Sequence, residues 1–137
     1  MAYLLDTNIV IAAMKGVPEV RLRLESTPLS QIILSGIVLG ELELGAEKSQ
    51  HPTRNRSRLE ELKNNIPFLG LTDATSRTYG QIRGALEKQG AKIAANDLWI
   101  AAQALTEDAT LVTDNTREFS RVPALKLENW INRIKTR

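Results

Sequence analysis

The chain of 137 residues contains no cysteine and a single histidine, His51. Without cysteine it can form no disulfide, iron–sulfur cluster or thiolate zinc site, and this composition suits a reducing compartment. The lone histidine falls in a predicted loop beside Pro52, which argues against a histidine-based metal centre or a serine–histidine triad. These absences remove several common catalytic classes before any motif is considered.

The sequence also predicts no leader segment and no membrane-spanning run. The first residues carry no basic region, and Asp6 interrupts the apolar run, so no signal peptide is predicted. The longest uncharged stretch, residues 26–40, is shorter than the ~20 apolar residues that cross a bilayer. The glycines form no phosphate-binding loop, which argues against nucleoside triphosphate or dinucleotide binding. We therefore expect a cytoplasmic protein without a membrane partner.

The charge is nearly balanced but unevenly placed. The formal net charge is +2, and bases gather at Arg54, Arg56 and Arg58 and again in the last residues of the chain. Such clusters are usually solvated surface, although they also allow a polyanionic partner.

Apolar runs alternate with segments of helical periodicity. Strands are predicted at residues 3–5, 31–34, 66–71 and 110–113, with a weak fifth near Leu125. Helices are predicted at residues 9–14, 17–25, 37–48, 52–64, 73–89 and 96–105, with a last helix containing Trp130 and Ile134. This alternation predicts an α/β fold in which helices cover both faces of a parallel sheet, as one domain over residues 1–137.

Three acidic residues fall where such sheets bind ligands, outside the carboxyl ends of strands or at the start of a helix. Asp6 directly follows the first predicted strand, Asp114 directly follows the fourth, and Asp97 begins a helix. Each alone is well explained as a helix cap or turn residue. The repetition of one geometry is what suggests a shared site.

Glu41 adds a fourth acid from inside a predicted helix. It stands three residues after Val38 and four after Ile37, on the apolar stripe that we assign to Ile37, Val38, Leu42, Leu44 and Gly45. Burying a lone carboxylate is costly unless it meets a cation, a donor or a proton. Converging carboxylates repel one another, and a hard divalent metal relieves that repulsion and serves phosphoryl chemistry.

Several short motifs, in order along the chain, resemble one known family. They are Leu4-Leu5-Asp6-Thr7-Asn8, Gly40-Glu41-Leu42, the segment from Asn96 to Ala102, Leu111-Val112-Thr113-Asp114-Asn115 and Arg117-Glu118-Phe119. Together they resemble the PIN-domain ribonucleases, and most closely the VapC toxins of bacterial toxin–antitoxin pairs. The resemblance implies a three-layer fold with a parallel sheet of about five strands, and an endoribonuclease that depends on Mg²⁺ or Mn²⁺.

The resemblance also implies roles for particular residues. Asp6, Glu41, Asp97 and Asp114 match the acidic quartet that binds metal and carries catalysis. Supporting roles fall to Thr7 and Asn8 beside Asp6, to Thr113, and to Arg117 as a phosphate contact.

Partners follow from the same resemblance. It implies an RNA substrate, with transfer RNA favoured, a cognate VapB-type antitoxin, and a toxin homodimer within a hetero-oligomer. The first two helices and the helix around residues 54–63 are the expected antitoxin groove. The rival interpretations are a PIN-like DNA nuclease and a non-catalytic binding module. An aspartyl phosphatase is disfavoured because Asn8 stands where a second aspartate is required.

Overall fold

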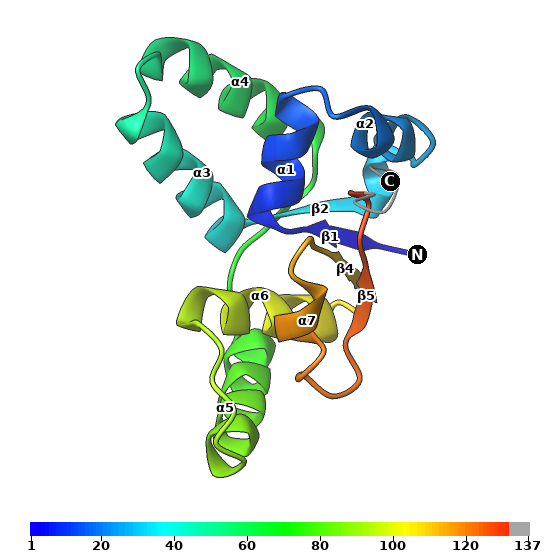
Figure 1. The fold of residues 1–137 in the computed structure, drawn as a ribbon, viewed down its shortest axis with the longest axis vertical. Coiled ribbons are helices and arrows are strands. Elements are labelled where there is room, and N and C mark those ends of the chain that lie inside the picture. The colour runs from blue at the N-terminus through cyan, green and yellow to red at the C-terminus, as the bar shows by residue number, and fades with distance from the viewer. Residues whose placement is uncertain (132–137) are drawn as a thin grey trace, which may run out of the picture.

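The computed structural model describes residues 1–131, and its centre is a sheet of five strands (Figure 1). The strands are β1 (Tyr3–Leu5), β2 (Ile32–Ser35), β3 (Phe68–Leu69), β4 (Thr110–Val112) and β5 (Lys126–Glu128). Their order is β3-β2-β1-β4-β5, and every pairing is parallel. The predicted parallel sheet is confirmed, with β1 at its centre and β4 as its neighbour.

The helices cover both faces of this sheet. Those on one side are α1 (Thr7–Met14), α2 (Pro18–Glu25), α3 (Gly36–Lys48) and α4 (Pro52–Asn65), and those on the other are α5 (Asp73–Lys88), α6 (Ala95–Thr106) and α7 (Thr116–Phe119), as Figure 1 shows. A short 3₁₀ turn, Leu29–Gln31, leads into β2. The α/β class and the layer arrangement are therefore as expected from the alternation of strands and helices.

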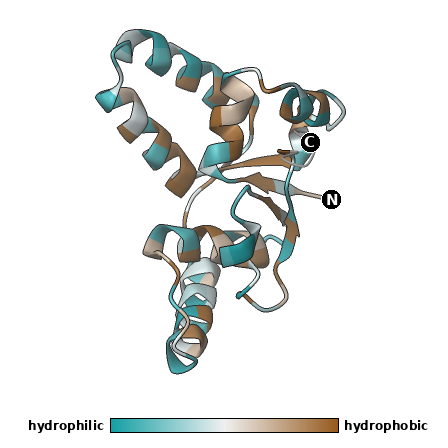
Figure 2. Cartoon of the chain, in the orientation of Figure 1, coloured by the Kyte–Doolittle hydropathy of each residue, from teal (hydrophilic) through white to brown (hydrophobic). Residues whose placement is uncertain are grey.

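Burial explains why these helices pack where they do. On α6, Leu98 and Ile100 are buried together with several alanines, so its small side chains let it lie close to the sheet. The amphipathic α5 packs on α6 and buries only Thr75 and Leu86 of its own residues. Figure 2 shows apolar colour concentrated on the strands and on the inner helices, and polar colour along the outer ones.

Some local expectations were wrong. The third strand is only Phe68–Leu69, because Pro67 has no amide hydrogen to donate and the strand lies at the sheet edge. Trp130 follows β5 in irregular chain rather than in a helix, and the remainder of that predicted helix falls at residues 132–137, outside the described part.

The stripe assigned to α3 was shifted. Leu44 is 54% exposed, and the residues of α3 that are buried are Val38, Leu42 and Ala46. Among residues 1–131, no helix combines the length and apolar character needed to cross a membrane.

Candidate active site

Asp6 lies at the carboxyl end of the central strand and is 6% exposed. Its backbone amide donates to Val112 O at 2.9 Å, which ties it to the end of β4. Oδ1 accepts from the Thr7 amide at 2.8 Å, and Oδ2 accepts from Thr113 Oγ1 at 2.7 Å. Asp6 is thus the N-cap of α1 and also a buried carboxylate held by two donors, so its structural and functional interpretations are compatible.

Glu41 reaches the same region from α3. Thr7 Oγ1 donates to Glu41 Oε1, and Asn96 Nδ2 donates weakly to Glu41 Oε2 at 3.5 Å. Thr7, which follows Asp6, and Asn96, which precedes Asp97, therefore both contact the Glu41 carboxylate. Asn96 lies in the first turn of α6, which begins at Ala95, and its side chain turns toward Glu41.

Asp97 lies in the first turn of α6 and meets Glu118 of α7. Their two carboxyl groups are within hydrogen-bonding reach, which requires a proton on one of them. When both are ionised, Glu118 Oε1 is a buried oxygen without a donor in residues 1–131. Such an orphaned oxygen is costly unless a proton or a cation supplies the missing partner.

The pKa values reflect this crowding of negative charge. Burial raises the pKa of Asp97 to about 7, with further contributions from the Glu118 hydrogen bond and the charges of Asp6, Glu118 and Glu41. Burial also raises the pKa of Asp6, reinforced by Glu41 and Glu118, although its bonds from Thr113 and Thr7 act in the opposite direction. Asp6, Glu41, Asp97 and Glu118 therefore form one electrostatic cluster, which we call the acidic cluster.

Asp114 and the residues expected to support the site lie on β4, α1 and α7 or directly beside them. The Asp114 Oδ1 atom accepts from Asn129 Nδ2 at 3.1 Å, just after β4. Asn8 is exposed, and so is Arg117, which precedes Glu118 on α7. Thr113 Oγ1 also accepts from the Asn115 amide at 3.0 Å, so one threonine fixes both the Asp6 carboxylate and the turn after β4.

Sequence reasoning missed Glu118 as a site residue. It was noted only as part of a motif, because α7 is too short to show a helical stripe. The signal that could have found it is an acid four residues beyond Asp114, beside the apolar Phe119 that anchors α7 in the core.

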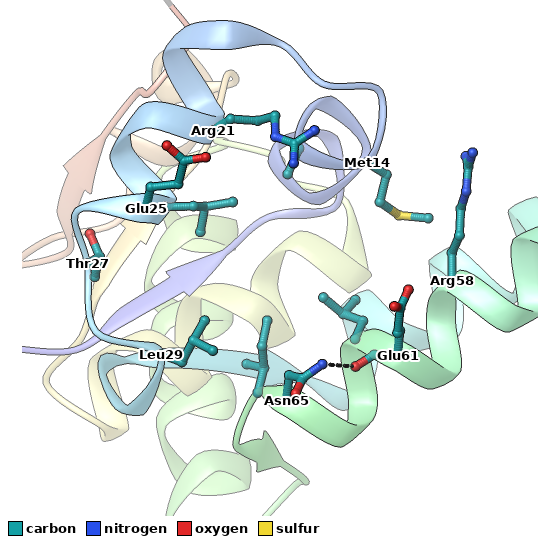
Figure 3. A pocket seen from close by; sticks show the side chains of 12 residues that line it. Met14, Arg21, Glu25, Thr27, Leu29, Arg58, Glu61 and Asn65 are labelled. Carbon is teal, nitrogen blue, oxygen red and sulfur yellow. Dashed lines mark hydrogen bonds between the residues drawn. The ribbon is translucent and has the colours of Figure 1, made fainter.

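A groove among the helices of one layer is the other notable surface. It has a volume of about 670 Å³ and is lined by α1, α2 and α4, with Met14, Leu24, Arg58 and Leu62 among its walls (Figure 3). A smaller cavity of about 170 Å³ shares Met14 and Arg58 with it and is also lined by Glu41. The groove and the smaller cavity are therefore adjacent, and the smaller cavity borders Glu41 of the acidic cluster.

The acidic cluster is the place where a metal ion could bind. Within residues 1–131, no three acidic or histidine side chains already stand in an arrangement that would hold a metal ion. The cluster nevertheless offers only hard carboxylate oxygens, one of them an orphan when ionised, which is the donor chemistry that Mg²⁺ and Mn²⁺ prefer.

Comparison with known proteins identifies the family to which this fold belongs. Residues 3–125 match the family model of the PIN domain. The chain is 40% identical over 131 residues to "Ribonuclease VapC2" of Haemophilus influenzae, covering 96% of this chain and 99% of that protein. It is 39% identical over 131 residues to "tRNA(fMet)-specific endonuclease VapC" of Shigella flexneri, covering 95% and 98%.

A solved structure agrees with these relatives. The crystal structure of VapBC2 from Rickettsia felis, bound to a DNA fragment from its promoter, matches with a TM-score of 0.89 and 39% identity, over 96% of this chain and 100% of that one. The chain therefore belongs to the PIN-domain family, and within it to the VapC ribonucleases.

Proposed function

We propose that this chain is a metal-dependent endoribonuclease toxin that hydrolyses phosphodiester bonds in a structured RNA. The observation that carries the proposal is the acidic cluster, which joins carboxylates from four separate elements where β1 and β4 end. The Shigella flexneri relative, described as a tRNA(fMet)-specific endonuclease, supports transfer RNA as the substrate class.

A divalent cation, Mg²⁺ or Mn²⁺, fits the donor set. Asp6, Asp97 and Glu118 would hold it, with Glu41 and Asp114 as further ligands directly or through water. A bound cation of this kind would lower the pKa of a coordinated water and neutralise charge on the reacting phosphate oxygens. The proposal therefore adds Glu118 to the quartet expected from the sequence.

The chain's own side chains orient and hold this site. Thr113 and the Thr7 amide fix the two oxygens of Asp6, so the carboxylate cannot rotate freely. Thr7 Oγ1 turns Glu41 toward the cluster. Arg117 is exposed beside Glu118 and has no ion-pair partner in residues 1–131, so it is free to contact an RNA phosphate.

The groove of α1, α2 and α4 is the surface that we assign to an antitoxin of the VapB type. It occupies the region expected from the sequence, and its connection through Met14 and Arg58 to Glu41 would let a basic side chain reach the carboxylates. The Rickettsia felis complex, a VapBC2 assembly, supports such a partner. A toxin homodimer within the complex remains part of the proposal.

The test is RNA cleavage by the purified chain with Mg²⁺ or with EDTA. We expect cleavage of a transfer RNA mixture in Mg²⁺, none in EDTA, and a loss of about 100-fold or more in Asp6→Ala, Asp97→Asn and Glu118→Gln. Single-stranded DNA of matched sequence distinguishes a DNA nuclease. Cleavage at the wild-type rate by all three variants, with unchanged Mg²⁺ affinity, would exclude the mechanism.

A further inference from the structure

Gln103 is a fully buried polar side chain in the last turn of α6. Its Oε1 accepts a hydrogen bond from Ser35 Oγ. Its Nε2 donates to Leu69 O at 3.3 Å and to Gly70 O at 3.4 Å. A buried amide is tolerated when its polar atoms are paired, and here they join α6 to the ends of β2 and β3.

Ser35 is the N-cap of α3, and it is also fully buried. Its Oγ accepts from the Ile37 amide at 3.1 Å and the Val38 amide at 3.3 Å. A hydroxyl has one hydrogen and two lone pairs, so donation to Gln103 leaves the lone pairs for the first turn of the helix. Gln103 therefore orients the group that starts α3.

The two helices joined at this point carry two acids of the cluster. Ser35 lies six residues before Glu41, and Gln103 lies six residues after Asp97 (41 − 35 and 103 − 97). Each acid is therefore about 9 Å along its helix from the junction, at 1.5 Å per residue. The same helices meet again where Asn96 donates to Glu41, so Glu41 takes part in this second contact and Asp97 lies between the two contacts along α6.

We propose that Gln103 is a positioning residue, whose bond to Ser35 sets the spacing between Glu41 on α3 and Asp97 on α6 and thereby the affinity for a divalent cation. This inference rests on the proposed function, because it assumes that these carboxylates bind metal. Gln103 touches neither RNA nor metal in this scheme, and it acts through the cap of α3.

The test replaces Gln103 by methionine, which has a similar volume and no hydrogen-bonding amide. In the metal-free protein, we expect faster amide hydrogen exchange at Ile37 and Val38. Titration calorimetry with Mn²⁺ should show an affinity about tenfold or more below wild type, as for other residues that orient metal ligands. Ser35→Ala should reproduce both effects, and the double variant should be no worse than either single variant.

Thr75→Val is the matched control, since Thr75 is another buried hydroxyl, bonded to Thr72 at the start of α5 and away from the acids. It should lower the unfolding temperature without changing Mn²⁺ affinity. If Gln103→Met has wild-type Mn²⁺ affinity and wild-type exchange at Ile37 and Val38, this inference is overturned while the proposed function stands. Where Gln103→Met does not fold, the same result for Ser35→Ala overturns it. A wild-type chain that binds no Mn²⁺ overturns the proposed function and this inference with it.

Discussion

The Asp97–Glu118 pair shows how a single contact links the stability of the fold to its chemistry. Two carboxyl groups that share a proton are stable together at low pH and repel each other when both ionise. The raised pKa of Asp97, about 7, lies near neutral pH. The Asp97 carboxyl group should therefore respond both to protons and to divalent cations at pH values near its pKa.

We predict that the metal-free protein becomes less stable as the pH rises from about 4 to about 7. The pKa of Asp97 is 3.8 unfolded and about 7 folded, so the native state holds an extra proton in this window. That stability is fully present below pH 3.8 and is lost as the pH passes through 7. Chemical denaturation between pH 5 and 8 measures it, in EDTA.

The control for this pH dependence is Asp97→Asn. It removes the titrating group, so its unfolding free energy should vary less between pH 5 and 8 than that of the wild type. Adding Mg²⁺ should also flatten the wild-type profile, because the cation replaces the proton. A wild-type profile that rises with pH over this window would contradict the assignment.

We predict that Thr113→Val destabilises the chain by about 1.5–3 kcal/mol, the value of a hydrogen bond to a charged group. Thr113 is fully buried and donates to Asp6 Oδ2, and valine keeps its shape without the donor. The loss should grow as the pH rises, because the bond favours ionised Asp6, whose pKa is raised by burial. In an Asp6→Asn background the same substitution should cost less, which urea unfolding of the double-mutant cycle can measure.

At the scale of single residues, some members of the acidic cluster could be predicted from the sequence and others could not. Asp6 and Asp97 could be found because each follows or begins a regular element, where chain direction fixes the position of the side chain. Glu118 could not, because its placement depends on how four residues of α7 pack through Phe119. Gln103 was equally hidden, since its role depends on contacts with β2 and β3 that no local pattern encodes.

Among the elements, α5 shows most clearly how local sequence sets local structure. Thr72 caps its start by accepting from the Thr75 amide at 3.1 Å. Its end follows from Gly90, whose φ of +73° lets the Ala91 amide bond back to Leu86 O at 3.0 Å. Both ends were predicted from the sequence. The short β3 was overestimated because its length depends on pairing with β2 rather than on its own apolar residues.

We predict opposite effects from alanine at two glycines of this region. Gly84 lies in the exposed interior of α5, where an added Cβ meets no atom within 4 Å, so Gly84→Ala should stabilise by about 0.5–1 kcal/mol. Gly90→Ala should destabilise by about 1–2 kcal/mol, because its positive φ is strained for alanine. Thermal unfolding of both variants measures this, and two shifts of the same sign would contradict it.

At the scale of the whole molecule, the proposed RNA substrate has to bind beside a cluster of carboxylates. A polyanion is repelled by the carboxylates unless cations or surrounding basic residues offset them. Arg54 and Arg58 of α4 have no ion-pair partner within residues 1–131, whereas Arg56 is paired with Glu47. The basic cluster predicted from the sequence is thus divided by the fold into available and engaged side chains.

We predict that RNA binding by this chain weakens steeply with salt and that Arg54 contributes to the slope. In the Asp97→Asn background, which prevents cleavage, Arg54→Ala should reduce the slope of log affinity against log salt by about 0.7–0.9, the value of one phosphate contact. Arg56→Ala should reduce it less, because Glu47 already neutralises that guanidinium. Binding of a labelled transfer RNA between 50 and 300 mM KCl, roughly the range over which counterion release is measured, tests this. Equal slopes in the parent and Arg54→Ala would show that RNA approaches from another face, with Arg117 on α7 as the next side chain to test.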